Sequence, residues 1–281
     1  MTGDRRLRWR PRSPLPGFRP TFGFTLVWLV LIVLVPLATI FAGTATMGWD
    51  RFVAVGLSDR AIAAYRLSFG TAAAAAAVNA VFGLLVAWVL VRYAFPGRRI
   101  VSALVDLPFA LPTAVAGVAL TALYAPNGWI GRYLDAAGIQ VAFTPLGITL
   151  ALVFIGLPFV VRTVEPVLAD LGHDVEEAAA TLGATPRQTF ARVILPALGP
   201  ALLTGFALAF ARGVGEYGSV IFISGNMPGR TEIAPLLIVT QLEQYAYDGA
   251  TAIATVMMLA AFAVLLALNL LQAFVRRRRG E

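Results

Sequence analysis

The chain consists of long apolar stretches separated by short polar segments rich in arginine, glycine and proline. The hydrocarbon core of a bilayer is about 30 Å thick, so a helix needs roughly 20 apolar residues to cross it. Six stretches meet this requirement, and the pattern predicts an all-α, polytopic membrane protein with six transmembrane helices. These stretches cover residues 24–42, 68–92, 100–124, 146–164, 201–222 and 250–274.

Prolines interrupt several of these stretches, among them Pro108, Pro112 and Pro158. A proline would end a helix in water, but in a membrane bundle neighbouring helices and local adjustments can satisfy the freed carbonyls. We therefore expect kinks within continuous spans. A run of small residues at 71–78, with Gly70 and Gly83 beside it, predicts that another helix approaches closely there.

The composition supports a membrane protein and excludes several kinds of chemistry. Hydrophobic residues make up 59% of the chain and charged residues only 13%. There is no cysteine and a single histidine, His173, so disulfides, thiolate metal sites and multi-histidine sites are excluded, and we expect no metal or cofactor. All 22 basic residues are arginine, and a chain without lysine cannot contain the Gly-rich phosphate loop that ends in Lys-Ser/Thr. If ATP drives this protein, another chain binds the nucleotide.

Arginines are distributed unevenly between the two sides of the predicted spans. Fifteen flank one side and five the other, and arginine is enriched in short loops that stay in the cytoplasm. Both termini are therefore predicted to be cytoplasmic. The larger group lies in residues 1–20, 92–99, 187–192 and 276–279, and the smaller group is Arg51, Arg60, Arg66, Arg132 and Arg230.

These basic ends explain the net charge of +7 without nucleic acid, because anionic lipid attracts arginines at cytoplasmic membrane ends. The N-terminus could also begin a cleaved secretory signal, although its apolar region is long for one. We predict a cytoplasmic arm over residues 1–21, a transmembrane domain over 22–275 and a basic tail over 276–281.

The largest predicted cytoplasmic loop, residues 167–200, carries signals for two helices. The first is expected over residues 174–182. Acidic residues in its first turn interact favourably with the helix dipole, and Gly183 is a residue type that commonly ends a helix. The acidic residues are Asp174, Glu176 and Glu177. Thr185-Pro186 with Gln188 forms a capping-box pattern that starts a second helix, running to about Leu195. Taken alone, the pair could be an ordinary interfacial helix pair on the headgroups.

The loop also contains Glu177-Ala178-Ala179, three residues, Gly183, nine residues, and then Val193-Ile194-Leu195-Pro196. This spacing resembles the cytoplasmic signature of ABC importer permeases, with Val193 where isoleucine is usual. The resemblance implies the type I ABC importer permease fold, in which the first helix of the signature docks in a cleft of the ATPase subunit. It also implies an ATPase-coupling set of Glu177, Ala178, Ala179, Gly183, Leu195 and Pro196.

Other segments resemble the T-type permeases of sulfate/thiosulfate importers, namely residues 106–117, 123–128, 158–168 and 213–226. The stretch Arg212 to Gly218 is similar in molybdate permeases as well, so a molybdate/tungstate permease remains an alternative. The resemblance implies a bacterial plasma (inner) membrane protein that is not itself an enzyme. Its implied partners are an ABC ATPase in two copies, a second homologous permease, an extracytoplasmic sulfate/thiosulfate-binding protein and membrane lipids.

An ion-coupled secondary anion transporter would explain the spans but not the loop signature. Dependence of transport on ATP and a separate ATPase distinguishes the two classes.

Charged residues inside the predicted spans need partners, since each costs about 2.5 to 3.5 kcal/mol at the bilayer centre. Arg212 and Glu216 lie four residues apart on one helical face of the fifth stretch. They could form a structural ion pair, or Arg212 could face the pathway and attract a dianion while Glu216 limits its retention. Tyr217 and Thr113 are further pathway candidates.

Other polar residues in the spans could bind the anion or could serve the structure. Hydroxyls such as those of Thr113, Ser219 and Ser224 could bind oxyanion oxygens or join packed helices. Asp106 is an odd choice for binding an anion, so we interpret it as structural, capping or bonding kinked backbone.

Overall fold

A computed structural model describes residues 18–278 of the chain, and within this range the protein is helical with no strand. The predicted arm and tail fall largely outside the described residues, at 1–17 and 279–281. The first half comprises α1 (Phe18–Leu29), η1 (Val30–Leu34), α2 (Val35–Met47), α3 (Trp49–Gly56), α4 (Asp59–Arg92), α5 (Arg98–Ala110), α6 (Thr113–Tyr124) and α7 (Gly131–Ala136). The second half comprises α8 (Pro145–Asp170), α9 (Asp174–Thr181), α10 (Pro186–Thr189), η2 (Phe190–Ile194), α11 (Leu195–Val214), α12 (Val220–Ile223), α13 (Ala234–Glu243) and α14 (Tyr247–Arg278).

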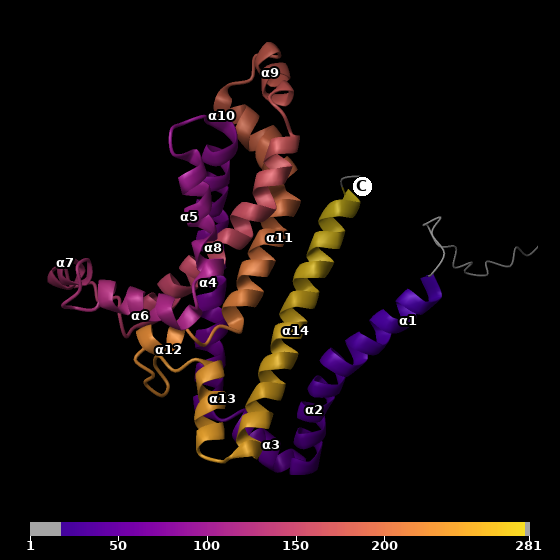
Figure 1. Cartoon of the computed structure of the whole chain (residues 1–281), viewed down its shortest axis with the longest axis vertical. Helices are drawn as coiled ribbons and strands as arrows, with labels where there is room; N and C mark the ends of the chain where they lie inside the picture. Colours follow the sequence, from indigo (N-terminus) through magenta and orange to yellow (C-terminus); the bar gives the residue numbers. More distant parts are fainter. Residues whose placement is uncertain (1–17, 279–281) are drawn as a thin grey trace, which may run out of the picture.

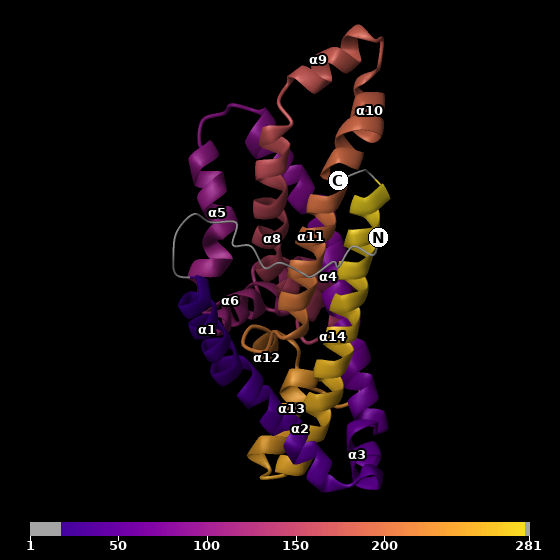
Figure 2. The same ribbon diagram turned by 90° about the vertical axis from the view of Figure 1, so that its right-hand side faces the viewer.

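The described residues contain five helices long and apolar enough to cross a membrane, or six if the bent pair α5–α6 is one span. The five are Pro20–Met47, Asp59–Arg92, Pro145–Asp170, Pro186–Val214 and Tyr247–Phe274. Figures 1 and 2 show α9 and α10 at one end of the molecule, and α3 with the turn between α13 and α14 at the other. The all-α, multi-span prediction is confirmed.

The third predicted span is not a kinked continuous helix, and this expectation was wrong. Its helices α5 and α6 meet at an angle of 112°. Leu111 and Pro112 between them have extended backbone angles, with ψ of 134° and 132°. A residue before proline is disfavoured in the helical region, which accounts for Leu111. At Pro158 the predicted continuity of the span is confirmed, because this residue lies inside helix α8.

The fifth predicted span also differs in its bounds. It begins at Pro186 and ends at Val214, so the second helix of the loop runs directly into it. Residues 215–219 then form a turn before the short helix α12. Hydropathy extended the predicted span past this end because α12 beyond the turn consists of apolar residues. The short helix α13 was not anticipated.

Two π-helical turns, η1 and η2, interrupt the first and fifth spans. At the end of each turn, the amide of the following residue donates to the carbonyl five residues earlier. Val35 N donates to Val30 O, and Leu195 N donates to Phe190 O. The next residue is Pro36 in the first case and Pro196 in the second. A proline ring clashes with the carbonyl four residues earlier, and the wider turn accommodates it. Leu195-Pro196 of the loop signature therefore has a local structural effect.

Helices α4, α8 and α11 form the core of the bundle, and they approach through small residues. A Cβ added to Gly83 of α4 would lie 2.8 Å from Val160 Cγ1, and one added to Gly205 of α11 would lie 2.9 Å from Val160 Cα. The alanines of the 71–78 run include Ala72, Ala75 and Ala76, which are buried. The close approach is confirmed at Gly83 but not at Gly70, where an added Cβ would meet no other described residue within 4 Å.

The first span lies at the edge of the bundle. Its most apolar window is not buried at all, and Figure 1 shows α1 diverging from the other helices. Its lower part, α2, packs against α14, where the Thr44 and Thr255 hydroxyls lie 2.8 Å apart.

Candidate coupling helix and pathway residues

Helix α9 extends beyond the bundle between α8 and α10 (Figure 2). It covers Asp174–Thr181, which agrees with the predicted helix, and its first turn contains the three acidic residues expected there. Gly183 ends it with a φ of +81°, a conformation that suits glycine, and its amide bonds to Ala180 O at 2.9 Å. The next amide, of Ala184, bonds to Ala179 O at 3.0 Å. The predicted stop at Gly183 is confirmed.

The start of the following helix also agrees with the prediction. Thr185 N donates to Gln188 Oε1 at 2.8 Å, and Gln188 N donates to Thr185 Oγ1 at 3.4 Å, which completes the capping box. Caps at both sides of a short connection fix the angle between α9 and α10. The two helices therefore form a defined hairpin.

The surface of α9 is suited to contact with another protein. Glu177 and Ala178 are exposed, whereas Ala179 faces inward and is buried. Leu182, at the tip, is 88% exposed. The exposed Glu177 and Leu182 therefore leave α9 and its C-terminal end open to contact by another protein.

The remaining two signature residues do not lie on this hairpin. Leu195 and Pro196 begin α11, after η2. Leu195 also lines an apolar cavity of about 650 Å³ with Trp88 and Phe190, on the flank of the bundle. The sequence grouped six residues as a coupling set, and the structure places four of them, residues 177–179 and 183, together.

Arg212 and Glu216 form an ion pair, as the four-residue spacing predicted. However, they do not share one continuous helix, because α11 ends at Val214 and Glu216 lies in the turn that follows. The Glu216 side chain is 2% exposed and that of Arg212 is 35% exposed. Glu216 Oε1 also accepts hydrogen bonds from Ser219 N at 2.9 Å and Ser219 Oγ at 3.0 Å. The carboxylate therefore joins α11 to α12.

Helix α6 lies against this turn, so the other pathway candidates are nearby. A Cβ added to Gly218 would contact the Thr113 side chain, and one added to Gly117 would lie 2.7 Å from Ser219 Cα. Tyr217 is partly buried and packs on the main hydrophobic core. The structure thus brings Arg212, Glu216, Tyr217 and Thr113 to one region, where α6, α11 and α12 meet.

The three hydroxyls considered as oxyanion donors have different surroundings. Ser219 is buried and engaged with Glu216, as described above. Ser224 is buried as well, and its Oγ lies 2.5 Å from Asn226 Oδ1 in the loop after α12. Thr113 is partly buried against Gly218. Both serines stabilise local structure in this conformation.

Asp106 has a structural role, but its partner is a side chain rather than kinked backbone. Arg162 of α8 donates through Nε to Asp106 Oδ1 at 2.8 Å and through Nη2 to Ser102 O at 2.9 Å. Arg162 also pairs with Glu165, one turn along α8. Sequence reasoning missed this cluster, although the need of each charge within an apolar stretch for a partner was a usable signal.

The arrangement of spans and the α9–α10 hairpin is that of type I ABC permeases. One similar solved structure is a bacterial alginate ABC transporter, with a TM-score of 0.74 and 18% identity over 90% of this chain and 92% of that one. The MetNI methionine ABC transporter has a TM-score of 0.56 and 19% identity over 76% of this chain and 95% of that one. At such identities the likeness concerns the fold alone.

Sequence comparison identifies the family. Residues 79–281 match the binding-protein-dependent transport system inner membrane component, and the chain belongs to this family of transport components. It is 50% identical to the probable sulfate transport system permease protein cysT of Nephroselmis olivacea, over 92% of this chain and 91% of the relative. It is 47% identical to the sulfate transport system permease protein CysT of Escherichia coli K12, over 95% of this chain and 96% of the relative.

Proposed function

We propose that this chain is the T-type transmembrane subunit of an ATP-driven importer of sulfate and thiosulfate. The observation that carries the proposal is the 47–51% identity to sulfate permeases along nearly the whole chain. The α9–α10 hairpin adds a specific structural reason, because its capped geometry and exposed tip suit a docking surface for an ATPase.

The proposed complex contains two copies of an ABC ATPase, a second homologous permease and an extracytoplasmic sulfate/thiosulfate-binding protein, within membrane lipid. In this scheme the binding protein delivers the anion at the end opposite α9. Closure of the ATPase pair displaces α9, and the spans alternate between outward and inward access. The binding of nucleic acid has no role in this scheme.

The orientation is part of the proposal, with α9 and both termini in the cytoplasm of a bacterial inner membrane. It rests on the excess of arginine at that side. The chain has no cysteine, so single cysteines can be introduced and labelled with a membrane-impermeant maleimide. Leu182→Cys should be labelled only in inverted vesicles, and Trp49→Cys, 74% exposed at the other end, only in intact spheroplasts. The reverse pattern would overturn the orientation.

The functional test is uptake of radiolabelled sulfate into proteoliposomes that contain the complete complex. Uptake should require ATP, the ATPase, the binding protein and the second permease, and unlabelled thiosulfate should compete. Competition by molybdate or tungstate but not by thiosulfate would favour a molybdate/tungstate permease. Uptake driven by an ion gradient in the isolated chain would contradict the ABC assignment.

We also propose that Arg212, Glu216, Tyr217 and Thr113 lie beside the translocation pathway. In support of this, Arg212 is the more exposed partner of its ion pair. A partly exposed guanidinium can attract a dianion, while its buried carboxylate partner keeps the net charge low.

A further inference from the structure

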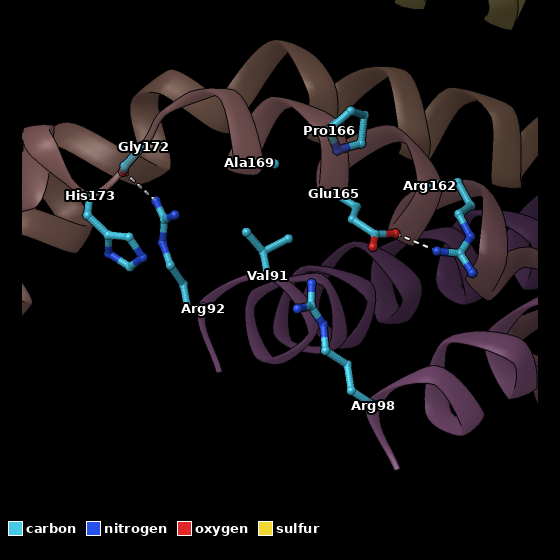
Figure 3. A pocket seen from close by; sticks show the side chains of 9 residues that line it. All are labelled: Val91, Arg92, Arg98, Arg162, Glu165, Pro166, Ala169, Gly172 and His173. Carbon is cyan, nitrogen blue, oxygen red and sulfur yellow. Dashed lines mark hydrogen bonds and ion pairs between the residues drawn. The ribbon is translucent and has the colours of Figure 1, made fainter. Parts of the chain in front are cut away.

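Arg92 is the last residue of α4, and its side chain reaches the base of α9 (Figure 3). The side chain is only 6% exposed. Nη2 donates to Gly172 O at 3.0 Å, in the turn between α8 and α9. Nε lies 2.8 Å from Glu176 Oε1 in the first turn of α9. The guanidinium also lies 5.6 Å from the centre of the Trp88 ring, one turn back along α4.

This contact is the only ion pair or side-chain hydrogen bond that links α9 to a transmembrane helix within the described residues. Among helices, α9 packs mainly against α10. Among the polar contacts of the described residues, α9 is therefore held to the bundle at Arg92. Because α4 belongs to the core with α8 and α11, a force on Glu176 acts on that core directly.

The geometry of the pair is that of charges in contact rather than of an aligned hydrogen bond. Arg92 Nε and Glu176 Oε1 are both buried, and neither has a hydrogen-bond partner of good geometry despite their separation of 2.8 Å. A buried charge is stable only while its counter-charge remains close. Separating α9 from α4 is accordingly opposed by electrostatics.

A cavity of about 530 Å³ lies beside this contact, and Figure 3 shows Arg92 and His173 on one side of it and Arg162 and Glu165 on the other. Among the residues that line it, Arg162 is paired with Asp106 and Glu165. The open space of the cavity leaves room for the turn before α9 to shift relative to α4.

We propose that Arg92 is a positioning residue that holds α9 on α4 through Glu176, so that displacement of α9 is passed to the transmembrane core. The inference rests on the proposed function, in which an ATPase displaces α9. It assigns Arg92 a part in coupling rather than in anion binding.

The test compares Arg92→Gln, Glu176→Gln and the double variant in proteoliposomes of the complete complex. The control is Arg98→Gln, because Arg98 lines the same cavity, is exposed and has no ion pair with residues 18–278. Uptake of sulfate per ATP hydrolysed should fall about five- to tenfold in each single variant. The double variant should lose no more than the worse single variant, since both remove one interaction.

A second readout does not depend on the transported substrate. Spin labels at Leu182→Cys and Tyr93→Cys, both exposed, report the separation of the α9 tip from the end of α4. Arg92→Gln should broaden the distance distribution, and Arg98→Gln should not.

Two outcomes would overturn the proposal. One is wild-type uptake per ATP in both single variants, and the other is losses that multiply in the double variant while the label distances stay unchanged. If the wild-type complex moves no sulfate, the proposed function fails separately, and the label distances alone decide the role of Arg92.

Discussion

The different burial of Arg212 and Glu216 predicts that the two residues respond unequally to neutralisation. In Arg212→Gln, a carboxylate that is 2% exposed loses its counter-charge. Removing one partner of a buried pair costs about 3–5 kcal/mol. In Glu216→Gln, the remaining charge is a guanidinium that is 35% exposed and can be partly hydrated. Glu216→Gln should therefore lower the free energy of unfolding by about 1–2 kcal/mol, between the values for exposed and for buried ion pairs.

Glutamine is the appropriate replacement for Glu216 because it keeps Oε1, the acceptor of both hydrogen bonds from Ser219. The double variant Arg212→Gln/Glu216→Gln contains no unpaired charge, so it should recover most of the stability that Arg212→Gln loses. Arg51→Gln provides the control. Arg51 pairs with Asp248 at 3.1 Å, both side chains are more than half exposed, and its loss should cost less than about 1 kcal/mol.

The assay is reversible unfolding of the purified chain in mixed detergent micelles, with the free energy of unfolding compared across the variants. Equal losses in the two single variants, or a double variant that loses their sum, would refute the reasoning from burial. Sulfate uptake by the stable double variant in the complete complex then tests the pathway. We expect reduced uptake with intact assembly. Normal uptake would show that Arg212 does not contribute to the translocation pathway.

Two further predictions concern glycines. Gly117→Ala should lower the free energy of unfolding by about 1–3 kcal/mol, because the new Cβ would lie 2.7 Å from Ser219 Cα. Gly70→Ala should not lower it, because its Cβ would meet no other described residue within 4 Å, and equal effects of the two substitutions would contradict this reasoning. Gly183→Pro should uncouple ATP hydrolysis from uptake or release the ATPase, because proline cannot adopt a φ of +81°, whereas Gly183→Asn should retain coupling. Glu177→Arg should have the same effect as Gly183→Pro, because it reverses an exposed charge on α9. Co-purification of the ATPase with each variant complex measures the effect. Full coupling in both variant complexes would refute the docking role.

The parts of the fold that depend on local sequence were predictable. Helix α9 agreed with the prediction to within one residue, because its acidic start, Gly183 and the Thr185–Gln188 capping box act within a few residues of each other. The long spans were predictable for a similar reason, since apolar length alone decides whether a helix can cross a bilayer.

The bend between α5 and α6 was not predictable from proline alone. Leu107-Pro108 and Leu111-Pro112 are identical dipeptides, yet the first lies inside α5 and the second separates α5 from α6. Two prolines four residues apart remove amides from successive turns and weaken the helix there. Packing of Gly117 against Ser219 then stabilises the bent arrangement, and this contact joins residues about a hundred positions apart.

Ion pairs between different helices were unpredictable because their partners are far apart in the sequence. The partner of Asp106 is 56 residues away, and the partner of Arg92 lies on the far side of four intervening helices in the chain. Each charge showed that a partner was required, but only the tertiary structure identifies which one. Arg212 and Glu216 were paired correctly because four residues separate them.

The two candidate sites are connected by one helical segment that contains the π-helical turn η2. Residues 186–214 extend from the capping box to the turn that holds Glu216, and at 1.5 Å per residue these 29 residues span about 43 Å. Near its middle, Gly205 contacts Val160 of α8 so closely that α11 cannot rotate there without separating the two helices. The segment has two irregular points, the π-helical turn η2 next to α10 and Pro200 inside α11, and both lie on the α10 side of Gly205. Between Gly205 and Val214 a displacement of α11 therefore carries Arg212 with it, while bending is favoured at η2 and Pro200.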